Sequence, residues 1–194
     1  MSRRWTLRLV ACALGASAVL TGCSSGNQEA RETLPSPTSA APSEEELPPL
    51  GPADMPMPAE ARTQDAAGAE AFVRYYIELI NRTSTVMDAQ PLRDLSAGCR
   101  DCDRIADNVE VDAAAGYQYR GGELSVAFAG EPFLRPGTAE LALEAEQAAA
   151  SAVDATGADA PHLALPPFAG INGGAALKWD PDRQTWIMTA LTLE

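Results

Sequence analysis

The sequence predicts a single α+β domain in which N-terminal helices pack on a curved antiparallel sheet. Two observations lead to this prediction. Between residues 66 and 116 the apolar side chains recur every three to four positions, which is the period of an amphipathic helix. After Gly116 they alternate with polar side chains, which is the period of a half-buried strand. Helices followed by a run of antiparallel strands are typical of the α+β class.

The first predicted helix lies in "QDAAGAEAFVRYYIELINRTS". Its apolar stripe follows the helical period and consists of Ala69, Phe72, Val73, Tyr76, Ile77 and Ile80. We expect Thr63 or Asp65 to cap its start and residues 81–84 to end it. A short second helix is expected in "DAQPLRDLSAG", because Pro91 suits a first helical turn and Gly98 suits a helix end.

A third helix is predicted from the cysteine pair toward Gly116. Its buried stripe is expected to contain Cys102, Ile105, Ala106, Val109 and Ala113. Cys99 lies one turn before Cys102, on nearly the same face.

The strands are predicted in three segments. "YQYRGGELSVAFAG" indicates strand, turn and strand, with the turn at Gly121-Gly122. "TAELALEAEQAAASAV" combines helix-forming residues with alternation, and we assign it as a strand because an antiparallel sheet flanks it. Residues 153–174 are expected to form a long loop. "AALKWDPDRQTWIMTALTL" predicts a final hairpin that turns at residues 180–183.

The N-terminal residues are typical of an export signal. Arginines precede an apolar run from Leu9 to Leu20, which is too short for a permanent membrane helix. The next residues, Leu20-Thr21-Gly22-Cys23, resemble a bacterial lipobox, whose cysteine receives a lipid after cleavage; an ordinary secretory signal is the alternative. We therefore expect residues 1–22 to be removed and Cys23 to hold the protein on the extracytoplasmic face of the cell membrane.

Residues 23–59 are expected to form a disordered tether, and residues 60–194 the folded domain. The tether contains more than half of the chain's 15 prolines and few large apolar residues. The segment "LPPLGPADMPMP" is interpreted as part of this tether; the alternative is that it is a polyproline ligand for another protein. The net charge of −13 becomes −16 without the signal, because 14 − 3 leaves 11 basic residues against 27 acidic ones. This surface argues against nucleic-acid binding.

The chain resembles two groupings of known proteins. The aromatic helix "AFVRYYIELIN", two further helices and a strand meander ending in a Trp-bearing hairpin are similar to the cone-shaped fold of the nuclear transport factor 2-like superfamily. The lipobox, the tether, "LSAGCRDC" and "YQYRGGEL" together resemble an uncharacterised actinobacterial lipoprotein family, domain of unknown function 6318. The second resemblance covers about residues 48–194 and implies a location and a fold without a known activity.

No catalytic motif is evident in the sequence. Enzymes of the cone fold place tunable acids and bases in the cavity, but the one histidine, His162, lies in a predicted loop and is expected to face solvent. Asp88, Tyr117, Tyr119 and Arg120 are candidates for a cone cavity, although packing or rim solvation explains them equally well. We expect no cofactor.

Cys99 and Cys102 are expected to form a disulfide that fixes the start of the third helix. Cys12 leaves with the signal and Cys23 is lipidated, so two thiols remain in an oxidising compartment. Thiol-disulfide exchange is the alternative. A zinc site needs four ligands, and only His162 could join the pair.

Together these observations predict a lipid-anchored, non-catalytic module that binds a cell-envelope protein or a small apolar ligand. A cone-fold enzyme that uses carboxylate or tyrosine chemistry is the first alternative, and a thiol-disulfide protein that uses Cys99 and Cys102 is the second.

Overall fold

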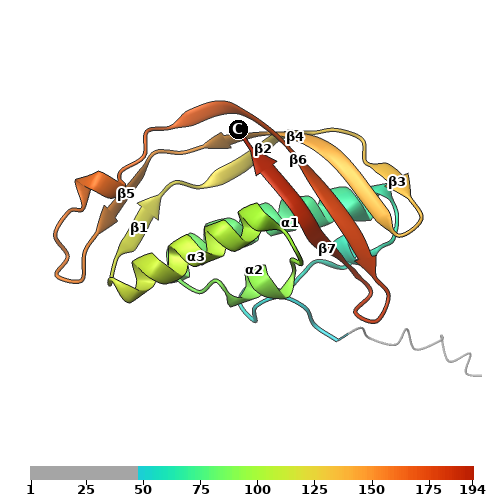
Figure 1. The fold of residues 1–194 in the computed structure, drawn as a ribbon, viewed down its shortest axis with the longest axis horizontal. Helices are drawn as coiled ribbons and strands as arrows, with labels where there is room; N and C mark the ends of the chain where they lie inside the picture. Colours follow the sequence, from blue (N-terminus) through green and yellow to red (C-terminus); the bar gives the residue numbers. More distant parts are fainter. Residues whose placement is uncertain (1–47) are drawn as a thin grey trace, which may run out of the picture. The chain divides into compact units, whose positions relative to one another are not determined.

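The computed structural model describes residues 48–194, in which the helices precede the strands (Figure 1). The helical part comprises a 3₁₀ turn η1 (Ala59–Arg62) and helices α1 (Ala66–Val86), α2 (Gln90–Asp94) and α3 (Arg100–Ala114). The strands are β1 (Gln118–Gly121), β2 (Leu124–Ala129), β3 (Phe133–Arg135), β4 (Thr138–Gln147), β5 (Ala150–Val153), β6 (Phe168–Asp180) and β7 (Thr185–Leu193), with the 3₁₀ turn η2 (Pro161–Leu163) before β6. This order confirms the predicted α+β class.

The strands form one main sheet and a two-stranded extension, with every pair antiparallel. The main sheet has the order β2-β4-β6-β7, and β3 pairs with β4 beyond the end of β2. The extension consists of β1 and β5. Figure 1 shows the sheet curving over α1 and α3, with β1 and β5 at one end of the arch. The helices therefore cover the concave face of the sheet.

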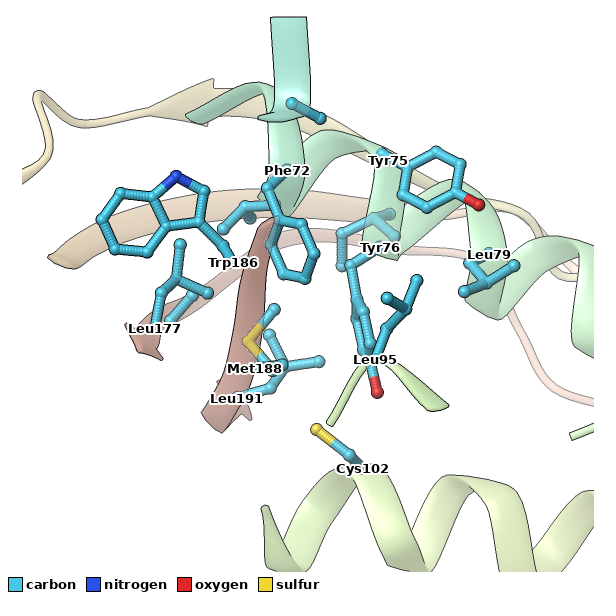
Figure 2. Close-up of a cluster of buried hydrophobic side chains, with 14 of the residues drawn as sticks. Phe72, Tyr75, Tyr76, Leu79, Leu95, Cys102, Leu177, Trp186, Met188 and Leu191 are labelled. Carbon is cyan, nitrogen blue, oxygen red and sulfur yellow. The ribbon is translucent and has the colours of Figure 1, made fainter. Parts of the chain in front are cut away.

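The core lies between α1 and the concave face (Figure 2). Side chains of alternating positions in β4, β6 and β7 meet the apolar stripe of α1, as expected for a sheet with one covered face. The largest fully buried side chains are Trp186, Tyr76, Phe72, Ile77 and Leu79. Two of them make hydrogen bonds at the edge of the core: Trp186 Nε1 donates to the Thr63 carbonyl oxygen at 2.9 Å, and the Tyr76 hydroxyl donates to that of Leu92 at 3.3 Å.

Helix α1 begins as predicted and ends two residues later than predicted. The Asp65 side chain caps it by accepting from the Gly68 backbone N–H at 2.7 Å. At the other end Met87 adopts the left-handed conformation, with φ of 57°, and stops the helix after Val86. Thr83 is fully buried, so the final turn, which the sequence placed at the helix end, packs in the core.

The connection from α2 to α3 also contacts the sheet. Helix α2 ends at Asp94, and Gly98, with φ of 67°, turns the chain into α3. Between these two points the Ala97 N–H donates to the Met188 carbonyl oxygen, and the Met188 N–H donates to that of Leu95, both at 2.9 Å. The connection therefore lies along the outer edge of β7.

The Gly121-Gly122 pair is not the hairpin turn that the sequence predicted. Both glycines have positive φ, 71° and 83°, but the chain bends there and continues into β2. The partner strand bends at the same level, so β1 pairs with β5 and β2 pairs with β4. A Cβ at Gly121 would overlap the carbonyl oxygen of Ala149. The glycines thus permit a close approach of two strands rather than a reversal of one.

The segment predicted as a loop up to residue 174 contains seven residues of β6. This strand begins at Phe168: "FAGINGG" has little apolar alternation, but it pairs with β4 from Phe168 onward, and β7 joins on the other side from Gly173. The remaining part, residues 154–167, contains only the short η2 turn. The final hairpin is confirmed: Asp180 accepts from the backbone N–H groups of Asp182 and Arg183 at 3.0 and 3.1 Å.

Residues 48–58 contact the domain, although the sequence placed them in the tether. Met57 is buried, and the carbonyl oxygen of Met55 accepts from the Tyr75 hydroxyl at 3.0 Å. The Arg62 guanidinium donates to the Pro48 carbonyl oxygen at 2.7 Å. The predicted signal (1–22), Cys23 and the tether up to residue 47 lie outside the described residues. Within 48–194 no helix combines the length and apolarity that crossing a membrane requires.

Candidate functional site

A cleft of about 290 Å³ opens between α1, α3 and the bent part of the sheet. We call it the α3 cleft. Its apolar lining comprises Ile80, Ile105, Val109, Leu124, Ala150 and Leu165. Its polar lining comprises Ser84, Arg104, Asn108, Asp112, Tyr119 and Gln147, and the Gly121-Gly122 bend completes the wall.

Helix α3 forms one side of the cleft with a single stripe. Arg104, Ile105, Asn108, Val109 and Asp112 have the spacing i, i+1, i+4, i+5 and i+8, so they share one face of the helix. At a rise of about 1.5 Å per residue, the two ends of this stripe are about 12 Å apart. The α3 cleft is therefore elongated along the helix, with a basic residue at one end and an acidic residue at the other.

The opposite wall depends on the bend in β1–β2 and on a contact from α1. A Cβ at Gly122 would lie 2.8 Å from the Ala150 Cβ, so the bend requires a residue without a side chain. Immediately after the bend, the Asn81 amide donates to the Leu124 carbonyl oxygen and accepts from the Leu124 N–H, both at 2.8 Å. Asn81 thus pairs with the free edge of β2 and fixes the distance between α1 and this wall.

One polar pair lies at the acidic end of the α3 cleft. The Tyr119 hydroxyl donates to Asp112 Oδ2 at 2.6 Å, and both residues are partly buried. Burial raises the pKa of Tyr119 to about 12, and the hydrogen bond to the Asp112 carboxylate acts in the same direction. The phenol is therefore protonated at neutral pH. It acts as a hydrogen-bond donor to Asp112 and not as a base.

A second hollow is larger but has exposed polar groups. It has a volume of about 470 Å³ and lies between residues 49–52 and α2. Its charged and polar side chains are all exposed to solvent, fully or in part: Asp88, Gln90, Asp94 and Arg183. The α3 cleft is the better candidate site, because its polar pair is partly buried and orders itself by an internal hydrogen bond.

The structure brings only one of the sequence candidates, Tyr119, into the cleft. Asp88 is solvent-accessible and lies 3.6 Å from the Arg82 guanidinium. Tyr117 packs edge-on against the His162 ring at 5.7 Å, outside the cleft lining, and His162 is exposed as predicted. Arg120 follows Tyr119 on β1 and is exposed on the opposite face of the strand.

Sequence reasoning missed Asp112 and Asn108. Asp112 follows Val109 by three residues and so lies on the apolar stripe of α3. A charged residue on a stripe that is otherwise apolar could have indicated a site. Asn108 carries no such signal, because it is exposed and lies beside the stripe. Both residues share the cleft lining with Gly121 and Gly122, where the sequence indicated a turn instead of a bend.

Cys99 and Cys102 stand at disulfide-bonding distance, with their Cα atoms 5.2 Å apart. Cys99 also caps α3, since its sulfur accepts from the Cys102 N–H at 3.3 Å. Both side chains are almost fully buried, at 1% and 2% exposure, and belong to the hydrophobic core, where Figure 2 shows Cys102. Thiol-disulfide exchange needs an attackable sulfur, so this burial favours the structural role over the redox alternative.

No group of three or more His, Cys, Asp or Glu side chains within residues 48–194 is arranged to hold a metal ion.

Several solved structures resemble this chain. The intermembrane-space region of the chloroplast protein ARC6 matches with a TM-score of 0.49 at 18% identity, over 68% of this chain and 97% of its own. A nuclear transport factor 2-like superfamily protein from Salmonella enterica serovar Typhimurium matches with a TM-score of 0.40 at 10% identity, over 67% and 92%. The protein Aln2 from a Streptomyces species matches with a TM-score of 0.37 at 16% identity, over 64% and 90%.

All three identities lie below 25% and all three TM-scores below 0.5, so these likenesses carry no argument about the fold family or the activity of this chain. No protein-family model and no curated protein matches the chain by sequence.

Proposed function

We propose that the protein is a lipid-anchored, extracytoplasmic binding protein whose α3 cleft holds a small, largely apolar ligand. The observation that supports this proposal is the lining of the cleft. Large apolar side chains from α1, α3, β2 and the segment before β6 surround one ordered polar pair. Sites for small molecules typically combine such apolar walls with a few fixed polar groups.

The anchor, the location and the family form part of the same proposal and rest on the sequence. The signal ends at a lipobox-like Cys23, and the motifs around the cysteine pair resemble the actinobacterial lipoproteins of domain of unknown function 6318. The Cys99–Cys102 disulfide supports an oxidising compartment. Intact-mass measurement of the protein from membranes tests the anchor, and an N-terminus at Met1 or an unmodified Cys23 would refute it.

A binding role is favoured over catalysis by the state of the polar pair. Tyr119 remains a protonated phenol at neutral pH, and its hydrogen bond to Asp112 occupies one carboxylate oxygen. General-base catalysis requires a group that can accept a proton near the working pH. The pair is therefore suited to orienting a ligand.

A cleft-filling variant tests the binding proposal. Asn108→Trp places a large side chain in the α3 cleft from its exposed rim, whereas Val111→Trp places the same side chain on the outer face of α3, where Val111 is 67% exposed. We expect 1-hexanol at millimolar concentration to shift the backbone NMR signals of Ile105, Val109 and Leu124 in the wild type and in V111W, but not in N108W. If no six-carbon probe of any charge shifts these signals in the wild type, the proposal is wrong.

A further inference from the structure

The α3 cleft has a charge asymmetry that narrows the class of its ligand. Resting on the binding function proposed above, we propose that the ligand is a small organic cation, with a protonated amine bound at Asp112 and Tyr119 and an apolar body lying along α3. The reasons are the acceptors at the acidic end, the position of the basic group, and the apolar wall between them.

The acidic end offers hydrogen-bond acceptors and no free donor on the polar pair. The single hydrogen of the Tyr119 hydroxyl is used on Asp112 Oδ2. In the described part of the chain no other side chain hydrogen-bonds to Asp112, so its Oδ1 and the lone pairs of the phenol remain as acceptors. An ammonium group has three donors and no acceptor, and it also interacts favourably with the face of a tyrosine ring.

Arg104 is the one basic group in the lining and lies too far away to oppose a cation at Asp112. The two residues are eight positions apart on α3, which places their backbones about 12 Å apart along the helix axis. Arg104 also lies 3.3 Å from the Asp101 carboxylate, which offsets its charge. Asp112 therefore sets the local sign of the potential at its end of the cleft.

The apolar wall lies between these two charged ends. Ile105 and Val109 of α3 face Ile80 and Leu124 across the cleft, which leaves room for a hydrocarbon body beside the ammonium site. The volume of about 290 Å³ is at the small end of the range for ligand sites, about 300 to 1,000 Å³, so the ligand is small. The net charge of −13 for the whole chain favours the approach of cations over anions.

Three probes of equal length separate the charge of the ligand from its apolar body. Hexylammonium, 1-hexanol and hexanoate are titrated into the full mature protein at pH 7 and low salt, and binding is followed by the NMR shifts of Ile105, Val109 and Leu124. We expect hexylammonium to bind about fivefold more tightly than 1-hexanol, which matches a partly exposed ion pair of about 1 kcal/mol, and hexanoate to bind most weakly. This preference should shrink when salt is raised to about 0.5 M.

Two variants localise the effect. Asp112→Asn keeps the shape and an acceptor for Tyr119 but removes the charge, so we expect it to weaken hexylammonium about fivefold and to leave 1-hexanol unchanged. Unchanged 1-hexanol binding also shows that this variant is folded. Arg100→Ala is the control, because Arg100 is an exposed basic residue of the same helix outside the cleft lining, and it should leave hexylammonium binding unchanged.

The outcomes distinguish this inference from the binding function on which it rests. Equal or tighter cleft binding of 1-hexanol or hexanoate would overturn the cationic ligand and leave the binding function intact. Weaker hexylammonium binding in R100A, to the extent seen in D112N, would also overturn it, because the effect would then not be localised at Asp112. Absence of cleft shifts with all three probes would refute both.

Discussion

Replacing Asn81 with alanine should detach the start of β2 from α1. The Asn81 amide makes two hydrogen bonds to the backbone of Leu124, each 2.8 Å long, on the edge of β2 that β4 does not use. Each net hydrogen bond is worth about 1 kcal/mol, so Asn81→Ala should lower the free energy of unfolding by about 2 kcal/mol. With a urea m-value of about 2 kcal/mol/M, the midpoint should fall by about 1 M.

The assay is urea unfolding followed by tryptophan fluorescence, because Trp186 is fully buried beside α1. Asn81→Asp is informative because a carboxylate accepts from the Leu124 N–H but cannot donate to its carbonyl oxygen. We expect N81D to be destabilised as well, since it brings a charge against that carbonyl group. Thr85→Ala, at an exposed position of the same helix, should change the free energy by less than about 0.5 kcal/mol. A wild-type midpoint for both Asn81 variants would refute the role assigned to this contact.

Three further perturbations test other parts of the structure. Gly122→Ala should lower the Tm more than Gly157→Ala does. Both glycines have φ above 80°, but of the two only Gly122 has a neighbour within 4 Å of an added Cβ. Equal losses of Tm would contradict the close packing at the bend. Exchanging both Cys99 and Cys102 for serine should lower the free energy of unfolding by about 2 kcal/mol, because a disulfide that closes a short loop contributes little chain entropy. A reductant should not lower the Tm of this variant any further. The pKa of Tyr119, raised to about 12 by burial and Asp112, exceeds its unfolded value of about 10, so its contribution is complete below pH 10 and is lost between pH 10 and 12. Tyr119→Phe should reduce that alkaline loss of stability, and an unchanged pH profile would argue against the raised pKa.

The helices were predictable because local chemistry determines them. The stripe of α1 packs in the core, Asp65 caps it, and Pro91 starts α2 as expected. The strands of the final hairpin were predictable for a similar reason, since Asp180 encodes its own turn. In each case the residues that determine the element lie close to one another in the sequence.

The bend and the beginning of β6 were not predictable because they depend on partners far along the chain. Gly121-Gly122 has the composition of a reversal, and only the approach of Ala149 and Ala150 turns it into a bend. The first residues of β6 have little alternation of their own and become a strand because β4 pairs with them. The bend forms one wall of the α3 cleft. The site was therefore not predictable from the sequence either, because it too depends on contacts between distant segments.

The backbone contact between the α2–α3 connection and Met188 affects how this protein meets other chains. The edge of a sheet exposes unpaired N–H and C=O groups, which invite strand addition by a second molecule. Leu95 and Ala97 occupy these groups at the middle of β7, and Cys99, two residues later, ties the connection to α3. A foreign strand therefore meets an occupied edge at Met188. The disulfide, which fixes the connection at its α3 end, thereby helps to keep this segment on the edge of β7.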